Sequence, residues 1–199
     1  VEVLLNPGVF RWHGKTGLLM RVCERPPQEK GWISLPILDP QAYGGIRIHR
    51  FRSDDPKLKA DDPRVIHYDG EPYLTTLSHL RLAWSEDGHQ FTVEKQPALI
   101  GEDPLESYGI EDARVSLLDG QYLITYSMVS SSGVGVGLVS TRDWKSYRRH
   151  GMILPPANKD AAIFEQKVGG KYLILHRPSG VNIGGNYIWL ASSPDLRHW

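Results

Sequence analysis

An internal repeat limits what this chain can fold into more than any other feature of its sequence. Three similar segments place an aspartate 50 and then 48 residues apart: Asp61-Asp62-Pro63-Arg64, Glu111-Asp112-Ala113-Arg114 and Lys159-Asp160-Ala161-Ala162. A looser copy begins near Asn6-Pro7-Gly8. Self-similarity at such a period is typical of propellers and other repeat folds. We therefore predict a single domain over residues 1–199, with repeats starting near 6, 61, 111 and 159.

Each copy continues as a series of short strands. A first apolar strand meets a turn of residues that accept positive φ: Asp69-Gly70, Asp119-Gly120 or Gly169-Gly170. A second strand, a third strand and a turn that begins with serine follow in the same order. Three or four strands per repeat, with few helical periods, predict an all-β fold of the β-propeller kind.

The last copy ends at Trp199, where its fourth strand should begin. A propeller closes by pairing its last blade with its first, because open blades leave unpaired strand edges. We therefore expect this chain to cover only part of a propeller, and an open edge would favour a homo-oligomer.

Composition excludes several classes of partner. Lysine plus arginine and aspartate plus glutamate number 23 each, so the net charge is zero and nucleic acid is not expected. No apolar segment is long enough to cross a membrane. The single cysteine, Cys23, fits a cytoplasmic protein whose fold does not depend on disulfides. The histidines lack metal-ligand spacing, so no metal site is predicted.

The repeated aspartates are the first candidates for chemistry. In a propeller the first strand of each blade lines the central channel, which would gather Asp62, Asp112 and Asp160 around one axis. Arg64 and Arg114 follow two residues later, on the same strand face. Clustered carboxylates suit glycosidic bond cleavage. The alternative, favoured for Asp62, is that such aspartates cap turns at the strand entrance.

Two groups of basic residues offer further contacts. Lys159, His176 and Arg177 could bind a phosphate oxyanion or form salt bridges to the channel aspartates. His79 and Arg81 alternate on one face of a predicted strand, where they contact either sugar hydroxyls or solvent.

Several blocks of the sequence, in one order, resemble glycoside hydrolase family 130, the mannoside phosphorylases and their hydrolytic relatives. The blocks are Tyr108-Gly-Ile-Glu-Asp-Ala-Arg-Val115, Asn158-Lys-Asp-Ala-Ala-Ile-Phe164 and Gly170-Lys-Tyr-Leu-Ile-Leu-His-Arg-Pro178, and the resemblance runs from Asn6 to Trp199. Glu165-Gln166 and the proline-rich stretch from Arg25 to Pro40 depart from the family pattern.

This resemblance implies a five-bladed propeller in which Asp112 is the general acid of an inverting reaction. It implies that inorganic phosphate is a co-substrate, which attacks the anomeric carbon and releases α-mannose 1-phosphate, and that no other cofactor is needed. Lys159 and Arg177 match positions of the family's basic set, with His176 beside them. We further expect these residues to contact the substrate: Asp62, Arg64, His79, Arg81, Tyr108, Glu111, Arg114 and Asp160.

The expected activity is thus phosphorolysis of β-1,2- or β-1,4-linked manno-oligosaccharides. Two alternatives remain at this point. One is an inverting β-mannosidase that uses water, and the other is a non-catalytic sugar-binding propeller or an inactive fragment.

Overall fold

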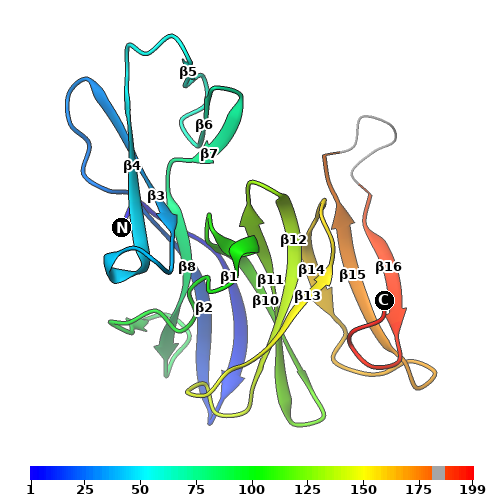
Figure 1. Ribbon diagram of the computed structural model, residues 1–199. Helices are drawn as coiled ribbons and strands as arrows, with labels where there is room; N and C mark the ends of the chain where they lie inside the picture. Colours follow the sequence, from blue (N-terminus) through cyan, green and yellow to red (C-terminus); the bar gives the residue numbers. More distant parts are fainter. Residues whose placement is uncertain (181–186) are drawn as a thin grey trace.

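The computed structural model describes residues 1–180 and 187–199 and is built almost entirely of antiparallel sheets (Figure 1). Three blade-like sheets stand side by side, and two smaller sheets project beyond the end of the first. The described helices are two three-residue 3-10 turns, η1 (Tyr43–Gly45) and η2 (Pro104–Glu106). No helix in these residues has the length and apolar character that a membrane span requires.

The blades follow one another along the chain. The first has the order β1-β2-β8-β9, the second β10-β11-β12-β13 and the third β14-β15-β16. Their bounds are β1 Val3–Trp12, β2 Lys15–Glu24, β8 Leu77–Ser85, β9 Thr92–Val93, β10 Ile110–Leu118, β11 Gln121–Ser130, β12 Gly133–Thr141, β13 Arg148–Leu154, β14 Asn158–Ile163, β15 Tyr172–Pro178 and β16 Trp189–Ser193.

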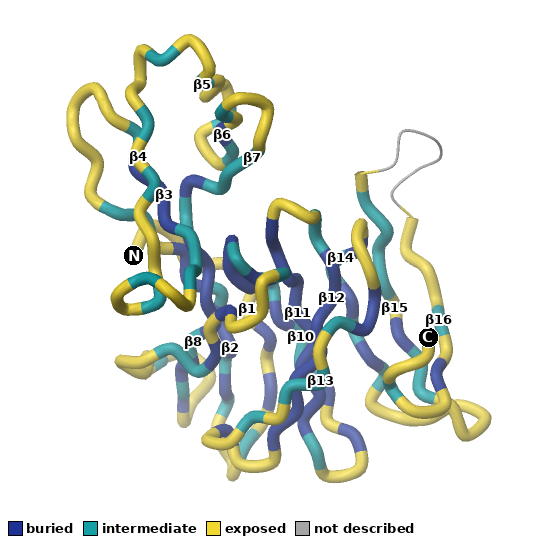
Figure 2. Tube along the Cα trace, viewed as in Figure 1, coloured by how far each residue is buried: buried dark blue, intermediate teal, exposed yellow. Residues whose placement is uncertain are grey.

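An insertion of residues 25–76 separates the second and third strands of the first blade. It contains a hairpin and a small three-stranded sheet, with the bounds β3 Trp32–Leu38, β4 Ile46–Arg52, β5 Leu58–Lys59, β6 Val65–Tyr68 and β7 Glu71–Leu74. Figure 1 shows both elements beyond the blade that they interrupt. Most of their residues are exposed or half-buried (Figure 2).

This insertion corrects the predicted repeat near residue 61. Strand β6 pairs with β5 and β7, and none of these three strands pairs with β8. The Asp69-Gly70 signal does form a hairpin turn, but the hairpin belongs to the insertion. The sheet that precedes β10 along the chain starts instead with β1, which contains the looser copy at Asn6. The other two repeats have first strands that begin at Ile110 and Asn158.

A β-bulge recurs in the first strand of every blade. The pairing register shifts between Leu5 and Gly8, between Glu111 and Arg114, and between Lys159 and Ala162. Within these bulges, three residues have left-handed φ, and they are Asn6 (40°), Asp112 (52°) and Asp160 (53°). Asparagine and aspartate tolerate this conformation better than most other residues, and a bulge redirects the side chain that it carries. The equivalent residue of the first blade is therefore Asn6, not Asp62.

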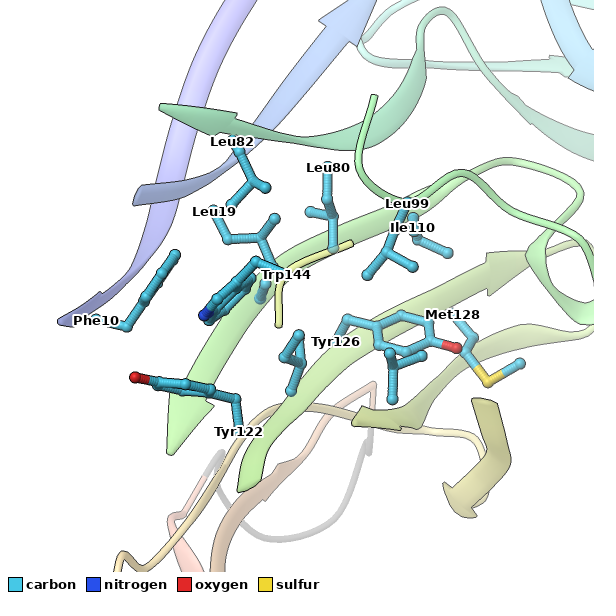
Figure 3. Close-up of a cluster of buried hydrophobic side chains, with 13 residues drawn as sticks. Phe10, Leu19, Leu80, Leu82, Leu99, Ile110, Tyr122, Tyr126, Met128 and Trp144 are labelled. Atoms are coloured by element: carbon cyan, nitrogen blue, oxygen red, sulfur yellow. The ribbon is translucent and has the colours of Figure 1, made fainter. Parts of the chain in front are cut away.

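The blades are held together by apolar packing between their faces. One cluster fills the space between the first two blades, where Phe10 stacks on Trp144 with ring centroids 3.6 Å apart (Figure 3). A second cluster, which includes Val136 and Ile174, joins the second blade to the third. The second blade is therefore the most deeply buried (Figure 2). Burial of apolar surface fixes the relative position of the blades, and with it the position of their bulges.

Candidate active site

The bulge in β10 presents Asp112 to polar groups from the first blade. The side-chain amide of Asn6 donates a hydrogen bond to Oδ1 of Asp112 over 3.0 Å. Nη1 of Arg21 lies 3.3 Å from the same oxygen. The Asp112 side chain is 15% exposed, so this carboxylate sits in a sheltered position with one edge open.

Arg21 of β2 lies at the centre of this polar cluster. Its Nη2 pairs with Oε1 of Glu111 at 2.6 Å, and its Nε donates to Oγ of Ser78 at 3.1 Å. Burial alone would lower the pKa of Arg21, but the negative charges of Glu111 and Asp112 outweigh it and hold the pKa above its ordinary value. Arg21 is thus a fixed cation between two carboxylates.

Glu111 shares Arg21 with Asp112, and its side chain is 16% exposed. Its Oε1 also accepts a hydrogen bond from the Ser78 hydroxyl at 3.3 Å. Burial raises the pKa of Glu111, an effect that the nearby charge of Arg21 partly offsets. Glu111 therefore holds Arg21 and Ser78 in place, and its expected contact with substrate stays a prediction.

The third blade contributes a basic pair beside an aspartate. Lys159 of β14 lies directly opposite Arg177 of β15 in the antiparallel register, so their side chains are neighbours. Nε of Arg177 donates to Oδ2 of Asp160 at 3.1 Å, and its Nη2 contacts the same oxygen. Arg177 thus forms a salt bridge to a bulge aspartate, which was the alternative to phosphate binding, and the phosphate-binding role of Lys159 and Arg177 stays a prediction.

His176 does not join this group. Its Nδ1 is 3.0 Å from Oδ1 of Asn158, and successive residues of a strand point to opposite faces of the sheet. Burial lowers the pKa of His176. The prediction that His176 and Arg177 bind one phosphate together does not fit this arrangement, because the alternation of β15 separates them.

Asp62 and Arg64 were expected around the channel axis, and this prediction is wrong. Both lie in the insertion and bind each other, with Arg64 Nη2 2.8 Å from Asp62 Oδ2. That bond and an amide hydrogen bond lower the pKa of Asp62 to about 2. Asp62 also accepts the backbone amide of Arg64, so it caps a turn, which is the alternative that its sequence context favoured.

Tyr108 and Arg114 flank Asp112 in the sequence, and both have hydrogen-bond partners within the protein. Tyr108 is 8% exposed and its hydroxyl donates to the carbonyl of Pro72 in the insertion at 2.9 Å. This bond commits the hydroxyl that was expected to contact substrate. Arg114 is half-buried and donates to the carbonyl of Ala113 at 3.1 Å, so it too has a local partner.

His79 and Arg81 do share one face of β8, as predicted, but it is not the face of Asp112. They line a cavity of about 840 Å³ between β8 and the β3–β4 hairpin. Glu24 is their acidic neighbour, at 3.7 Å from His79 and 3.8 Å from Arg81. Ser78, which precedes them, is the residue of this strand that touches the Asp112 cluster.

Three residues of the cluster were missed by sequence reasoning. Asn6 stood in the weakest repeat copy, and its alignment with Asp112 could have revealed it. Arg21 is the one charged residue between Gly17 and Cys23, which is a weak sign of a buried polar role. Ser78 carries no signal, because serine is common in strands and turns alike.

Comparison with known proteins identifies the family of this chain. A family model described as β-1,4-mannooligosaccharide phosphorylase matches residues 65–199. A β-1,2-mannobiose phosphorylase of Listeria innocua is 42% identical over 196 residues, which are 96% of this chain and 55% of the relative. The chain belongs to glycoside hydrolase family 130.

Two further likenesses agree with membership of family 130. The solved structure of the Listeria innocua β-1,2-mannobiose phosphorylase, in complex with β-1,2-mannobiose, superposes with a TM-score of 0.90 at 40% identity, covering 97% of this chain and 56% of that one. A β-1,2-mannobiose phosphorylase of Thermoanaerobacter is 34% identical over 157 residues, 76% of this chain and 50% of the relative. The predicted all-β, five-bladed propeller fold is thereby confirmed. The chain spans about half the length of the curated relatives that it matches.

Proposed function

We propose that this protein catalyses the inverting phosphorolysis of β-mannosides, with Asp112 as the general acid. The observation that carries the proposal is the pairing of two features on neighbouring blades. Asp112 is held by Asn6 and Arg21, and the basic pair of Lys159 and Arg177 lies on the next blade. An acid and an anion site placed beside one another are what phosphorolysis requires.

In the proposed reaction a phosphate oxygen forms a bond to the anomeric carbon from the face opposite the leaving sugar. The glycosidic bond breaks as the proton of Asp112 passes to the leaving oxygen, directly or through a sugar hydroxyl. Both recorded contacts of Asp112 within the described residues engage Oδ1, so we assign the proton to Oδ2. The products are α-mannose 1-phosphate and the leaving sugar, whose oxygen has received the proton.

We propose phosphate as co-substrate, with Lys159 and Arg177 as its ligands. Arg177 presents a planar fork of donors that suits a tetrahedral oxyanion, and Lys159 adds a point charge. Asp160 holds the Arg177 guanidinium before phosphate arrives, which reduces the ordering cost of binding. We leave His176 out of this set, because its ring is engaged by Asn158 and it alternates with Arg177 along β15.

A β-1,2-linked manno-oligosaccharide is the substrate that we propose first. Two relatives that match most of this chain carry β-1,2-mannobiose in their names, at 42% and 34% identity. The description of the family model, in contrast, names β-1,4-linked oligosaccharides.

We also propose a cytoplasmic location, supported by the single cysteine.

The test is incubation of the full-length protein with β-1,2- and β-1,4-mannobiose, with and without inorganic phosphate. Mannose 1-phosphate that forms only when phosphate is present is the expected product. Mannose formed without phosphate would instead identify a hydrolase, and no turnover of either disaccharide would reject the substrate assignment.

A further inference from the structure

The segment that leads into the catalytic strand is anchored by a buried carboxylate. Glu106 ends η2, and its side chain is only 1% exposed. The hydroxyl of Tyr126, in β11, donates to its Oε1 at 2.8 Å, and Nη1 of Arg149, in β13, lies 3.1 Å from its Oε2. The backbone amides of Glu102 and Asp103 donate to Oε2 at 2.8 and 3.2 Å. A charge this deeply buried is tolerated because each of its oxygens is bonded.

The backbone of the same segment is pressed against the first blade. The carbonyl of Glu106 accepts the amide of Gly109 at 2.7 Å, and Gly109 forms a β-bridge with Ser78. A Cβ on Gly109 would lie 2.4 Å from the carbonyl oxygen of Ser78, and its φ of +99° also favours glycine. The backbones of Gly109 and β8 are thus so close that no side chain fits between them.

Ser78 connects the backbone contact with Gly109 to the polar cluster around Asp112. Its hydroxyl touches both Glu111 and Arg21, and Arg21 pairs with Asp112. A shift of Gly109 relative to β8 would therefore alter the position of Arg21 beside the proposed acid.

We propose that Glu106 is a positioning residue for Asp112. Its carboxylate ties η2 to β11 and β13, which fixes Gly109 against β8 and so sets the geometry of Arg21 around the acid. The proposal rests on the proposed function of Asp112. Glu106 itself lies six residues before Asp112, and its side chain is buried.

The nature of the anchor favours positioning over bulk stabilisation. A buried ion pair contributes little net stability relative to apolar packing of the same volume. Its hydrogen bonds are directional, however, and a fully bonded buried network specifies one arrangement of the chain. Four donors from three separate parts of the fold converge on Glu106, which defines the path of residues 102–109 closely.

The experiment compares Glu106→Gln, Tyr126→Phe and a control, Val136→Ala, in the full-length protein. Val136 is fully buried in the cluster between the second and third blades, so its truncation lowers stability without touching the anchor. Each variant is assayed for kcat, for KM of the mannoside and for hydrogen exchange over residues 106–114. Tyr126→Phe removes the hydroxyl that donates to Glu106 and accepts a longer bond from Arg149, and it serves if Glu106→Gln does not fold.

We expect kcat to fall about 10- to 100-fold in Glu106→Gln and less in Tyr126→Phe, because small displacements of catalytic groups cost rates of this order. KM should change little, and exchange should rise selectively at 106–114. Equal kcat values in Glu106→Gln and Val136→Ala, or faster exchange without a loss of kcat, would overturn the proposal. Failure of the wild type to make mannose 1-phosphate would reject the proposed function instead, and the exchange data would still report on the anchor.

Discussion

Asn6 donates a hydrogen bond to Asp112 over 3.0 Å although 106 residues separate them in the sequence. Both residues occupy the left-handed position of a bulge, each in the first strand of its own blade. Because adjacent blades bring equivalent positions side by side, a local irregularity repeated in each blade produces a convergent polar site. The repeat itself, more than any one motif, therefore assembles the candidate active site.

Replacement of Asp112 by asparagine should abolish turnover while leaving the fold intact. The amide is nearly the same size as the carboxyl group but has no acidic proton to transfer, and loss of a general acid typically costs about 10²- to 10⁴-fold in rate. The measurement is kcat with β-1,2-mannobiose and phosphate, together with a thermal melting curve. Near wild-type kcat in this variant would remove Asp112 from the role of acid.

Replacement of Arg177 by alanine should weaken the use of phosphate more than the binding of sugar. Loss of a charged hydrogen-bonding partner costs about 1.5–3 kcal/mol, so KM for phosphate should rise by about tenfold or more. Arg142 is an exposed arginine after β12, at the end of the second blade away from Asp112, and its alanine variant is the matched control. An unchanged KM for phosphate in Arg177→Ala would reject this phosphate site.

Alanine at Gly109 should be far more damaging than alanine at Gly120. Both glycines have left-handed φ, which costs an ordinary residue about 1–2 kcal/mol. A Cβ at Gly120 meets nothing within 4 Å, whereas a Cβ at Gly109 collides with the backbone of Ser78. Melting temperature and kcat should therefore drop sharply in Gly109→Ala and only slightly in Gly120→Ala. Similar losses in both variants would show that the collision is relieved without cost.

Stability should fall as the pH drops below about 6.5. Burial lowers the pKa of His79; the charge of Glu24 opposes this shift, and the smaller effect of Arg81 adds to it. The unfolded chain therefore binds a proton in this range before the folded protein does, and protonation favours unfolding. The stability that His79 contributes is fully present above its pKa in the unfolded chain. It is lost as the pH falls from that value through the lower pKa of His79 in the folded protein.

The check is the change in melting temperature between about pH 7.5 and pH 5. His79→Gln should reduce this change, and the same substitution at the exposed His89 offers the matched control. An identical pH dependence in wild type and His79→Gln would exclude His79 as a source of acid instability.

The strand-and-turn pattern, the all-β class and the segment around Asp112 could be predicted from the sequence because their signals are local. Asp119-Gly120 forms the hairpin turn between β10 and β11 where the sequence placed one, and β8 presents His79 and Arg81 on one face. Turn chemistry and strand alternation act over a few residues, so the order of amino acids is enough to reveal them.

Only the tertiary structure decided which of these local elements belong to the same blade. The copy at Asp62 matched the repeat in residue type and spacing, yet its strands pair within an insertion, and the first blade is built from β1, β2, β8 and β9. Asn6 and Arg21 reach Asp112 through contacts between separate blades, and His176 leaves the basic group because of strand alternation on β15. Sheet pairing and blade packing are governed by the burial of faces that lie far apart in the chain, and such long-range partners leave little trace in any short stretch of sequence.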